Sequence, residues 1–281
     1  MKQILNTVII AAIALIAFSI TSCNTITGNG EIITQELNTS PFDEVTNHSS
    51  LNVTIIYSDT YKVIIEAESN LMPYILTVVN EHSLVIKTKP NITFKTFKDV
   101  RITVYCKNLE DIYNTGSGYI YAEEVVANDD FKISNTGSGD VEIKNITGCD
   151  DLEIRITGSG EVDVNYAICE SCEINVTGSG NCKINELIVG ELDVEITGSG
   201  DLTLSGECYD AEVKLTGSGK YHAYELYTNK YDIRITGSGS AQVRAIDMLT
   251  VRISGSGDVY YYGNPQINVS GSGSGKVISK N

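Results

Sequence analysis

A four-residue motif, Thr/Ser-Gly-Ser-Gly, recurs nine times between Thr115 and Gly273. Its copies begin at Thr115, Thr136, Thr157, Thr177, Thr197, Thr216, Thr236, Ser254 and Ser270, so that successive copies are 16 to 21 residues apart. A period near 20 residues is typical of a solenoid, in which each repeat is one structural unit that stacks on its neighbours. The repeat therefore predicts a solenoid.

Apolar and polar residues alternate on both sides of each motif. Apolar residues stand one, three and five positions before the Thr, as in the segment 152–156, and they resume at the fifth and seventh positions after it, as in 162–164. This period of two predicts a strand with one buried face on each side of the motif. The two glycines suit a tight turn because they tolerate positive φ or close backbone approach. One rung is thus predicted to be strand, GSG turn, strand and a variable loop of about five residues.

The expected assembly of such rungs is an all-β parallel β-helix of about 20 residues per rung. Each strand would pair with the equivalent strand of the next rung, and the alternating apolar residues would form columns inside the stack. Residues 106–281 are assigned to this GSG-repeat β-helix. Residues 23–105 lack the regular period and are predicted to be an N-terminal β segment or capping rungs.

Residues 1–22 are predicted to be a lipoprotein signal peptide. Lys2 is followed by an apolar run from Val8 to Ile20, which is too short for a comfortable membrane span. The sequence Ile20-Thr21-Ser22-Cys23 resembles a bacterial lipobox, which implies cleavage before Cys23 and lipid attachment to it. Asn24 at the next position favours an outer-membrane lipoprotein by analogy with lipoprotein sorting, on either the cell surface or the periplasmic face. The alternative is an ordinary secretory signal with a chance cysteine.

The chain is acidic, with 36 acidic and 20 basic residues and a formal net charge of −16. Such a surface repels nucleic acid, so that no nucleic-acid partner is predicted. Acidic residues also recur four positions before the Thr of successive motifs, beside a mostly basic column two positions before it. This pattern is interpreted as a solvated, charge-paired face, and a column that collects divalent cations is the alternative.

Six cysteines follow Cys23: Cys106, Cys149, Cys169, Cys172, Cys182 and Cys208. Three of them stand eight residues before the motif, in a column that they share with Val189, and this indicates buried packing. Stacked positions on parallel strands have poor disulfide geometry, so that free thiols are expected. The Cys169-x-x-Cys172 spacing invites a zinc or redox interpretation, but it has no second pair and no nearby His.

Residues spaced for catalysis are not recognised in the sequence. The GSG motif is not the GxSxG nucleophile elbow, and the histidines at 48, 82 and 222 share no spacing. No enzyme activity, metal or cofactor is therefore predicted. The alternative is a carbohydrate-active enzyme, a polysaccharide lyase or hydrolase, on the same scaffold. Such an enzyme should have a cluster of acids that breaks the repeat in one groove, and none is recognised.

Several short segments resemble a known family. They are Gly28–Glu31 (GNGE), Pro41–Val45 (PFDEV), Leu51–Ile55 (LNVTI), Glu66–Leu71 (EAESNL), Ser83–Ile86 (SLVI) and the run from Leu109 to Ile112 into the TGSG series. In this order they look like the head GIN domain family, which is described as a family of bacterial adhesins. The resemblance covers residues 28–281. It implies a right-handed β-helix with no known catalytic set and a role in adhesion.

The predicted function is a non-enzymatic cell-envelope adhesion or interaction module, held at the outer membrane by a lipid anchor. A purely structural envelope protein is a further alternative. The candidate ligand contacts are Tyr224 and Tyr227, because aromatic rings at the solvent face of the last rungs can stack on sugar rings. The expected partner is a glycan or an envelope protein. The alternative for these tyrosines is ordinary packing on a β surface.

Overall fold

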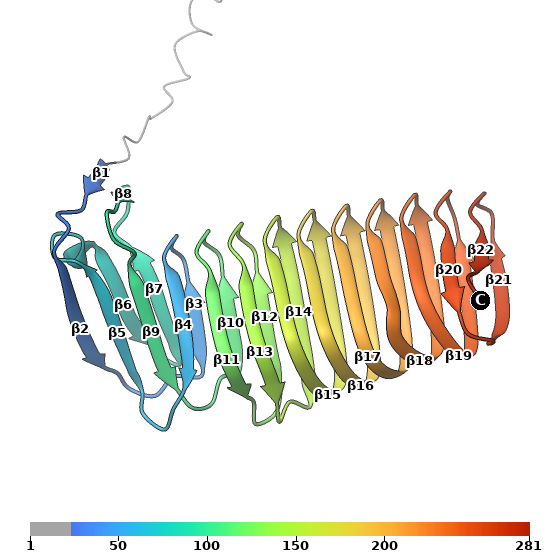
Figure 1. The fold of residues 1–281 in the computed structure, drawn as a ribbon, viewed down its shortest axis with the longest axis horizontal. Helices are drawn as coiled ribbons and strands as arrows, with labels where there is room; N and C mark the ends of the chain where they lie inside the picture. Colours follow the sequence, from blue (N-terminus) through green and yellow to red (C-terminus); the bar gives the residue numbers. More distant parts are fainter. Residues whose placement is uncertain (1–23) are drawn as a thin grey trace, which may run out of the picture.

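The computed structural model describes residues 24–281, which form one long β-solenoid (Figure 1). The lipobox and Cys23 lie outside the described residues. The strands before the repeats are β1 (Asn24–Thr27), β2 (Ile32–Asn38), β3 (Glu44–Asn47), β4 (Asn52–Tyr57), β5 (Lys62–Glu68), β6 (Ile75–Asn80), β7 (Ser83–Thr88), β8 (Ile92–Lys95) and β9 (Arg101–Cys106), with a short 3-10 helix η1 (Met72–Tyr74) before β6.

The repeat region contains the remaining strands. They are β10 (Asp111–Asn114), β11 (Ile120–Val126), β12 (Phe131–Asn135), β13 (Val141–Thr147), β14 (Asp151–Gly158), β15 (Glu161–Gly178), β16 (Asn181–Gly198), β17 (Asp201–Gly217), β18 (Lys220–Gly237), β19 (Ser240–Ile253), β20 (Val259–Tyr262), β21 (Gln266–Gly271) and β22 (Val277–Ser279). Successive rungs pair in parallel, so that Thr157, Thr177, Thr197, Thr216 and Thr236 form one column. The predicted parallel β-helix is confirmed.

The apolar columns form a continuous core. In β15 the inward side chains include Val162, Val164, Ala167, Cys172 and Ile174, all nearly inaccessible to solvent. The alternation breaks at 165–166 and again at 170–171, where two successive residues face outward. Because period two keeps a strand straight, these two breaks mark the bends that carry the chain around the core.

The prediction of a loop of about five residues in every rung is wrong for the central rungs. A connection between separate strands is present at 127–130, between β11 and β12, and at 148–150, between β13 and β14. From β15 to β18, in contrast, each rung is a single bent strand of 17 or 18 residues. Inward residues such as Ala167, Leu187 and Leu226 fill the corner there, so that backbone pairing continues through the bend.

The glycines of the motif meet two separate demands. The first glycine has left-handed backbone in most repeats, as at Gly178 with φ +110°. The second glycine is needed for space, since a Cβ at Gly200 would lie 2.2 Å from the Gly180 carbonyl oxygen of the rung below. Both conditions exclude most other residues.

The solenoid extends back before the first motif. Strands β3 and β4 pair in parallel with β10 and β11, and they are joined by a turn in which Ser49 and Leu51 occupy the two glycine positions. On the other side, β3 pairs in parallel with β7, and β4 pairs in parallel with β9. The antiparallel strands β6, β5 and β2 follow, and β1 pairs with β8 beside this end. Backbone pairing therefore continues across the predicted boundary between residues 105 and 106.

The six cysteines of the described chain are buried and unpaired. Burial raises the pKa of the Cys106 thiol to about 12, and it is also the main cause of the raised pKa of Cys208, which is about 12 as well. Thiols with such pKa values stay protonated and unreactive near neutral pH.

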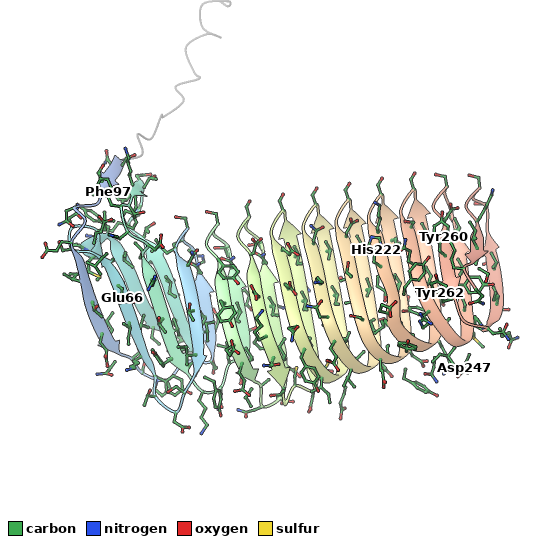
Figure 2. All side chains as sticks on the ribbon, viewed as in Figure 1. Glu66, Phe97, His222, Asp247, Tyr260 and Tyr262 are labelled. Carbon is green, nitrogen blue, oxygen red and sulfur yellow. The ribbon has the colours of Figure 1, made fainter. Side chains whose placement is uncertain are left out.

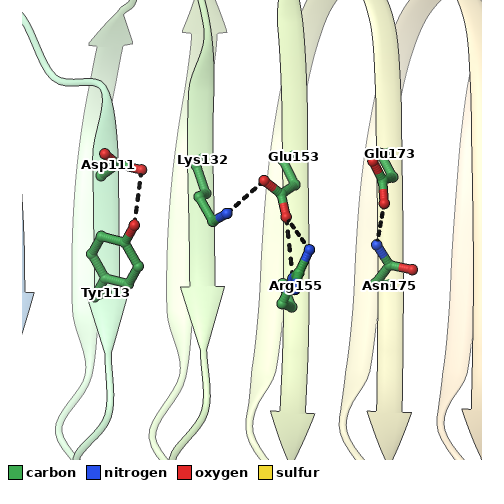
Figure 3. A network of polar contacts seen from close by, with 7 residues as sticks. All are labelled: Asp111, Tyr113, Lys132, Glu153, Arg155, Glu173 and Asn175. Carbon is green, nitrogen blue, oxygen red and sulfur yellow. Dashed lines mark hydrogen bonds and ion pairs between the residues drawn. The ribbon is translucent and has the colours of Figure 1, made fainter.

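The charged columns pair along and across the rungs (Figure 3). The Glu153 carboxylate accepts hydrogen bonds from Lys132 Nζ of the preceding rung and from Arg155 Nη2 of its own strand, both at 2.6 Å. In the next rung, Glu173 accepts from Asn175 Nδ2. In these rungs the acids have hydrogen-bond donors beside them, whereas Asp193 stands between two further acids of its column, Glu173 and Glu212.

Candidate functional site

A cluster of aromatic rings around one arginine lies on the outer face of the last rungs. It consists of Tyr224, Tyr227, Arg244 and Tyr262, and it is called the tyrosine–arginine cluster below. Its members come from three successive rungs: two from β18, one from β19 and one from β20. Figure 2 shows Tyr262 on the same face as Tyr260 and His222, whereas Asp247 lies at the lower edge of the solenoid.

A change in repeat length brings these side chains together. The motif spacing is 20 residues from Thr216 to Thr236 but 18 from Thr236 to Ser254. The register between β18 and β19 shifts accordingly, because Ala223 pairs with Val243 whereas Tyr227 pairs with Arg244. The additional residues of β18 bulge at this point, and bulges commonly redirect side chains at functional sites.

The guanidinium of Arg244 lies between two rings. Its Cζ is 4.8 Å from the ring centroid of Tyr227 and 5.2 Å from that of Tyr262. Its Nε donates to the Tyr224 carbonyl oxygen at 2.8 Å, and the Tyr224 and Tyr262 rings meet edge to face with centroids 4.8 Å apart. Cation–π contacts and a backbone hydrogen bond therefore hold the arginine in one orientation.

Groups of both charges lie around the cluster, since the exposed Glu207 is the register partner of Tyr227. His222 Nδ1 lies 2.9 Å from Gln242 Oε1, and Lys280 Nζ lies 4.8 Å from the Tyr260 ring. Burial, followed by the neighbouring phenols of Tyr262 and Tyr260, raises the pKa of Tyr224. The Tyr224 hydroxyl is therefore a neutral hydrogen-bonding group at physiological pH.

Exposed isoleucines lie along the lower edge of the rungs next to the cluster. Ile168 and Ile188 are register partners there, and the same column continues through the exposed Glu207 to Tyr227, which is 48% exposed. Ile188, Tyr209, Tyr227 and Ile246 line a groove of about 460 Å³, a size within the range of small-ligand sites. Tyr227 thus belongs both to the groove and to the cluster.

The two predicted contact residues lie close together, but in different settings. Tyr227 is largely exposed, whereas Tyr224 is half-buried against Tyr262. Arg244 was not recognised from the sequence, nor were the exposed side chains of Ile168, Ile188 and Ile246. The shortened repeat after Thr236 is the signal that could have indicated Arg244.

A second groove contradicts the expectation that no cluster of acidic residues lines a groove. Glu110, Asp111, Asp129 and Asp130 line a groove of about 550 Å³ beside Phe131, where the 127–130 connection leaves the ladder. Burial, followed by repulsion from Glu44, raises the pKa of the Asp111 carboxyl. Asp111 belongs to the aligned acidic column, whereas Asp129 and Asp130 come from the 127–130 connection, which the period does not align, so that the repeat concealed the cluster.

Metal-site geometry is not present in the described part of the chain: no three His, Cys, Asp or Glu residues are grouped to hold an ion. Among residues 24–281, no helix has the length and apolar character needed to cross a membrane.

Comparison with known proteins identifies the family. A family model described as "Putative auto-transporter adhesin, head GIN domain" matches residues 41–165 and again 153–265. The chain therefore belongs to the head GIN domain family. The family's name indicates an adhesion-type role at the cell surface or envelope, and it does not describe an enzyme. No curated protein matches the chain in sequence.

Solved structures share the fold over nearly the whole chain. A protein from Parabacteroides distasonis, described as a putative adhesin, is 21% identical with a TM-score of 0.70, and the match covers 91% of this chain and 100% of that one. A putative adhesin from Parabacteroides merdae is 22% identical with a TM-score of 0.65, covering 92% and 100%. A P. distasonis protein described as a putative lipid binding protein is 24% identical with a TM-score of 0.61, covering 92% and 100%. At these identities the likeness concerns the fold alone.

Proposed function

We propose that the protein is a lipid-anchored adhesion module of the outer membrane, and that it binds a glycan or an envelope protein through the tyrosine–arginine cluster and the adjoining apolar groove. The observation that carries the proposal is the exposed Tyr227, which joins a ligand-sized groove to an ordered aromatic cluster. An exposed apolar surface rimmed by polar groups is typical of an interaction site. The family's name supports the same role.

The binding surface is tested with Tyr224→Ala and Tyr227→Ala combined, in purified full chain held in detergent. Binding to a glycan array and to envelope proteins should fall at least about tenfold, because aromatic anchors dominate such contacts. The loss of the ring contact with Tyr262 should lower Tm by only about 2 to 4 °C. The control is the double variant Tyr57→Ala and Tyr166→Ala, which removes two tyrosines of other strands, β4 and β15. Undiminished binding by the first variant, or equal losses in both, would refute the assignment.

The anchor is tested separately with Cys23→Ser. Metabolic labelling with a fatty-acid analogue should mark the unsubstituted chain, and the serine variant should carry no label because it lacks the thiol that accepts the lipid. The variant should also leave the membrane fraction. Label retained by the serine variant would contradict the anchor at this residue.

The acid-lined groove favours a second candidate function, polysaccharide cleavage. A carboxyl with a raised pKa beside other carboxyl groups is an arrangement that general acid catalysis uses, and Asp111 has such surroundings. Reducing-end assays on acidic and neutral polysaccharides test it. Cleavage that disappears in Asp111→Asn would establish this activity, whereas no cleavage by the unsubstituted chain would dismiss it.

A further inference from the structure

Arg244 has a fixed orientation but no anionic partner. Its Nε donates a hydrogen bond to the Tyr224 carbonyl oxygen, and its guanidinium lies near the rings of Tyr227 and Tyr262. No carboxylate within residues 24–281 forms an ion pair with it. In contrast, Arg155 and Arg252 pair with Glu153 and Asp232. The terminal amino groups of Arg244 are thus left available for a ligand.

Arg244 and Lys280 bring positive charge to this face of an acidic chain. The formal net charge is −16, and the two cations lie together with His222, Gln242 and tyrosines. Carboxylates also lie nearby: Asp258 accepts a hydrogen bond from the Tyr260 hydroxyl at 3.1 Å, and the exposed Glu207 is the register partner of Tyr227. An arginine without an ion pair in such a surface favours a ligand that carries a local negative charge but little total charge, because the surrounding field repels polyanions.

We propose that Arg244 binds the carboxylate of an acidic sugar residue, flanked by Tyr227 and Tyr262. A guanidinium presents parallel donors that match the two oxygens of a carboxylate. Tyrosine rings offer apolar faces for the ring of a sugar, and Gln242, His222 and the Tyr224 hydroxyl supply the polar groups that sugar hydroxyls require. Because the arginine is already ordered, binding loses little side-chain freedom.

This inference rests on the proposed function, since it assigns the ligand class of the same surface. It adds one requirement, which is that the carboxylate contributes to affinity through Arg244. The ligand is then a mono-carboxylated sugar unit within a glycan. Inorganic phosphate would also pair with a guanidinium, but it has no ring to pack on the tyrosines; an acidic peptide is distinguished by the experiment below.

The test compares a trisaccharide that contains one glucuronic acid with its carboxyl-reduced neutral counterpart, on purified full chain in detergent. The acidic form should bind about tenfold more tightly. Arg244→Gln should abolish this preference while weak binding of the neutral form continues, which also shows that the variant is folded. Arg244→Lys should keep part of the preference, because it retains charge without the planar fork.

Arg234→Gln is the matched control, since Arg234 is an exposed arginine of β18 that also has no ion pair within the described chain. It should leave the preference intact. Equal binding of the acidic and neutral sugars, still dependent on Tyr224 and Tyr227, would overturn the inference and leave the proposed function standing. Binding of neither sugar, with no tyrosine-dependent ligand on the array, would overturn both. If inorganic phosphate or a glutamate-rich peptide binds more tightly than the acidic trisaccharide and depends on Arg244, the acidic sugar is the wrong ligand class and the inference is overturned.

Discussion

The early and the central rungs build the same turn by different means. In the early rungs, a buried asparagine precedes the motif and its side chain closes the turn, as when Asn114 Nδ2 donates to the Gly118 carbonyl oxygen at 2.9 Å. Asn47 and Asn135 make the equivalent bond at 3.0 and 2.7 Å. The first glycine of these motifs, at 116 and 137, does not adopt left-handed backbone.

In the central rungs the asparagine is replaced by an apolar residue. Asn135 pairs in register with Ile156, and the equivalent residue stays aliphatic in the following rungs through Ile253, whose own register partner in the last rung is Gly271. The first glycine then has φ between +110° and +134°, from Gly158 through Gly237. The turn is thus closed in two ways: by the left-handed backbone of the first glycine in the central rungs, and by a side-chain hydrogen bond of the asparagine in the early rungs.

The first turn of the stack shows why the glycines recur. Ser49 and Leu51 occupy the two glycine positions there, whereas a Cβ at Gly116 would lie 1.9 Å from the Ser49 carbonyl oxygen. Each later turn lies on the backbone of an earlier turn, which leaves no room for a side chain. Stacking, rather than the turn alone, therefore imposes most of the glycine requirement.

The largest expected effect comes from a substitution in a central turn. Gly178→Val combines left-handed backbone with a Cβ 2.8 Å from the Gly158 carbonyl oxygen, and it should lower the free energy of unfolding by about 2 to 3 kcal/mol. Ser179→Ala, at the exposed next position, should change it by less than about 0.5 kcal/mol. Denaturant unfolding measures both, and coincident midpoints would show that this turn is not constrained by backbone shape.

An intermediate effect is expected from the asparagine of an early turn. Asn135 is fully buried and donates to the carbonyl oxygens of Gly139 and Glu161, at 2.7 and 3.2 Å. Asn135→Ala leaves these acceptors without the donor and should cost about 1 to 2 kcal/mol of unfolding free energy. Asn175→Ala, which removes an outward amide bonded to Glu173, is the control and should cost much less. Equal costs would mean that the early turns do not depend on their asparagine.

The smallest expected effect distinguishes neighbouring rungs by pH. Partial burial opposes ionisation of Glu153, but the donors Lys132 and Arg155 outweigh it and lower the pKa of this carboxyl. A lowered folded-state pKa adds stability above the unfolded value of about 4.3, and this stability is lost as pH falls through the folded value. Glu153→Gln should therefore reduce stability at pH 7 by less than about 1 kcal/mol and have no effect near pH 2.

Glu173→Gln provides the matched control for this titration. Glu173 is the register partner of Glu153, but it accepts a hydrogen bond from the neutral Asn175. Its substitution removes no cationic pair and should therefore reduce stability at pH 7 by less than Glu153→Gln does. Urea unfolding at several pH values tests both variants, and a pH dependence as large for Glu173→Gln would exclude the cationic donors as the cause.

The sequence predicted only some of the residues that form the contact surface. Tyr221, Tyr231 and Tyr261 stand at inward positions of the alternating pattern, and the first two are buried whereas Tyr261 is only partly buried against the core. Tyr209 and Tyr227 are exposed. Arg244 could not be placed among the tyrosines in the same way. Its position depends on a register shift between β18 and β19, which a repeat aligned rung by rung does not reveal.

The sequence by itself determined the parallel stack, the inward columns and the recurring turn, because period-two alternation and a repeat near 20 residues admit few other arrangements. Only the tertiary structure decided where each rung bends, that β3 and β4 already belong to the stack, and which outward side chains meet. Outward residues carry no burial pattern, so their neighbours are set by register and by bulges. The core could therefore be predicted from periodicity, whereas the tyrosine–arginine cluster required the fold.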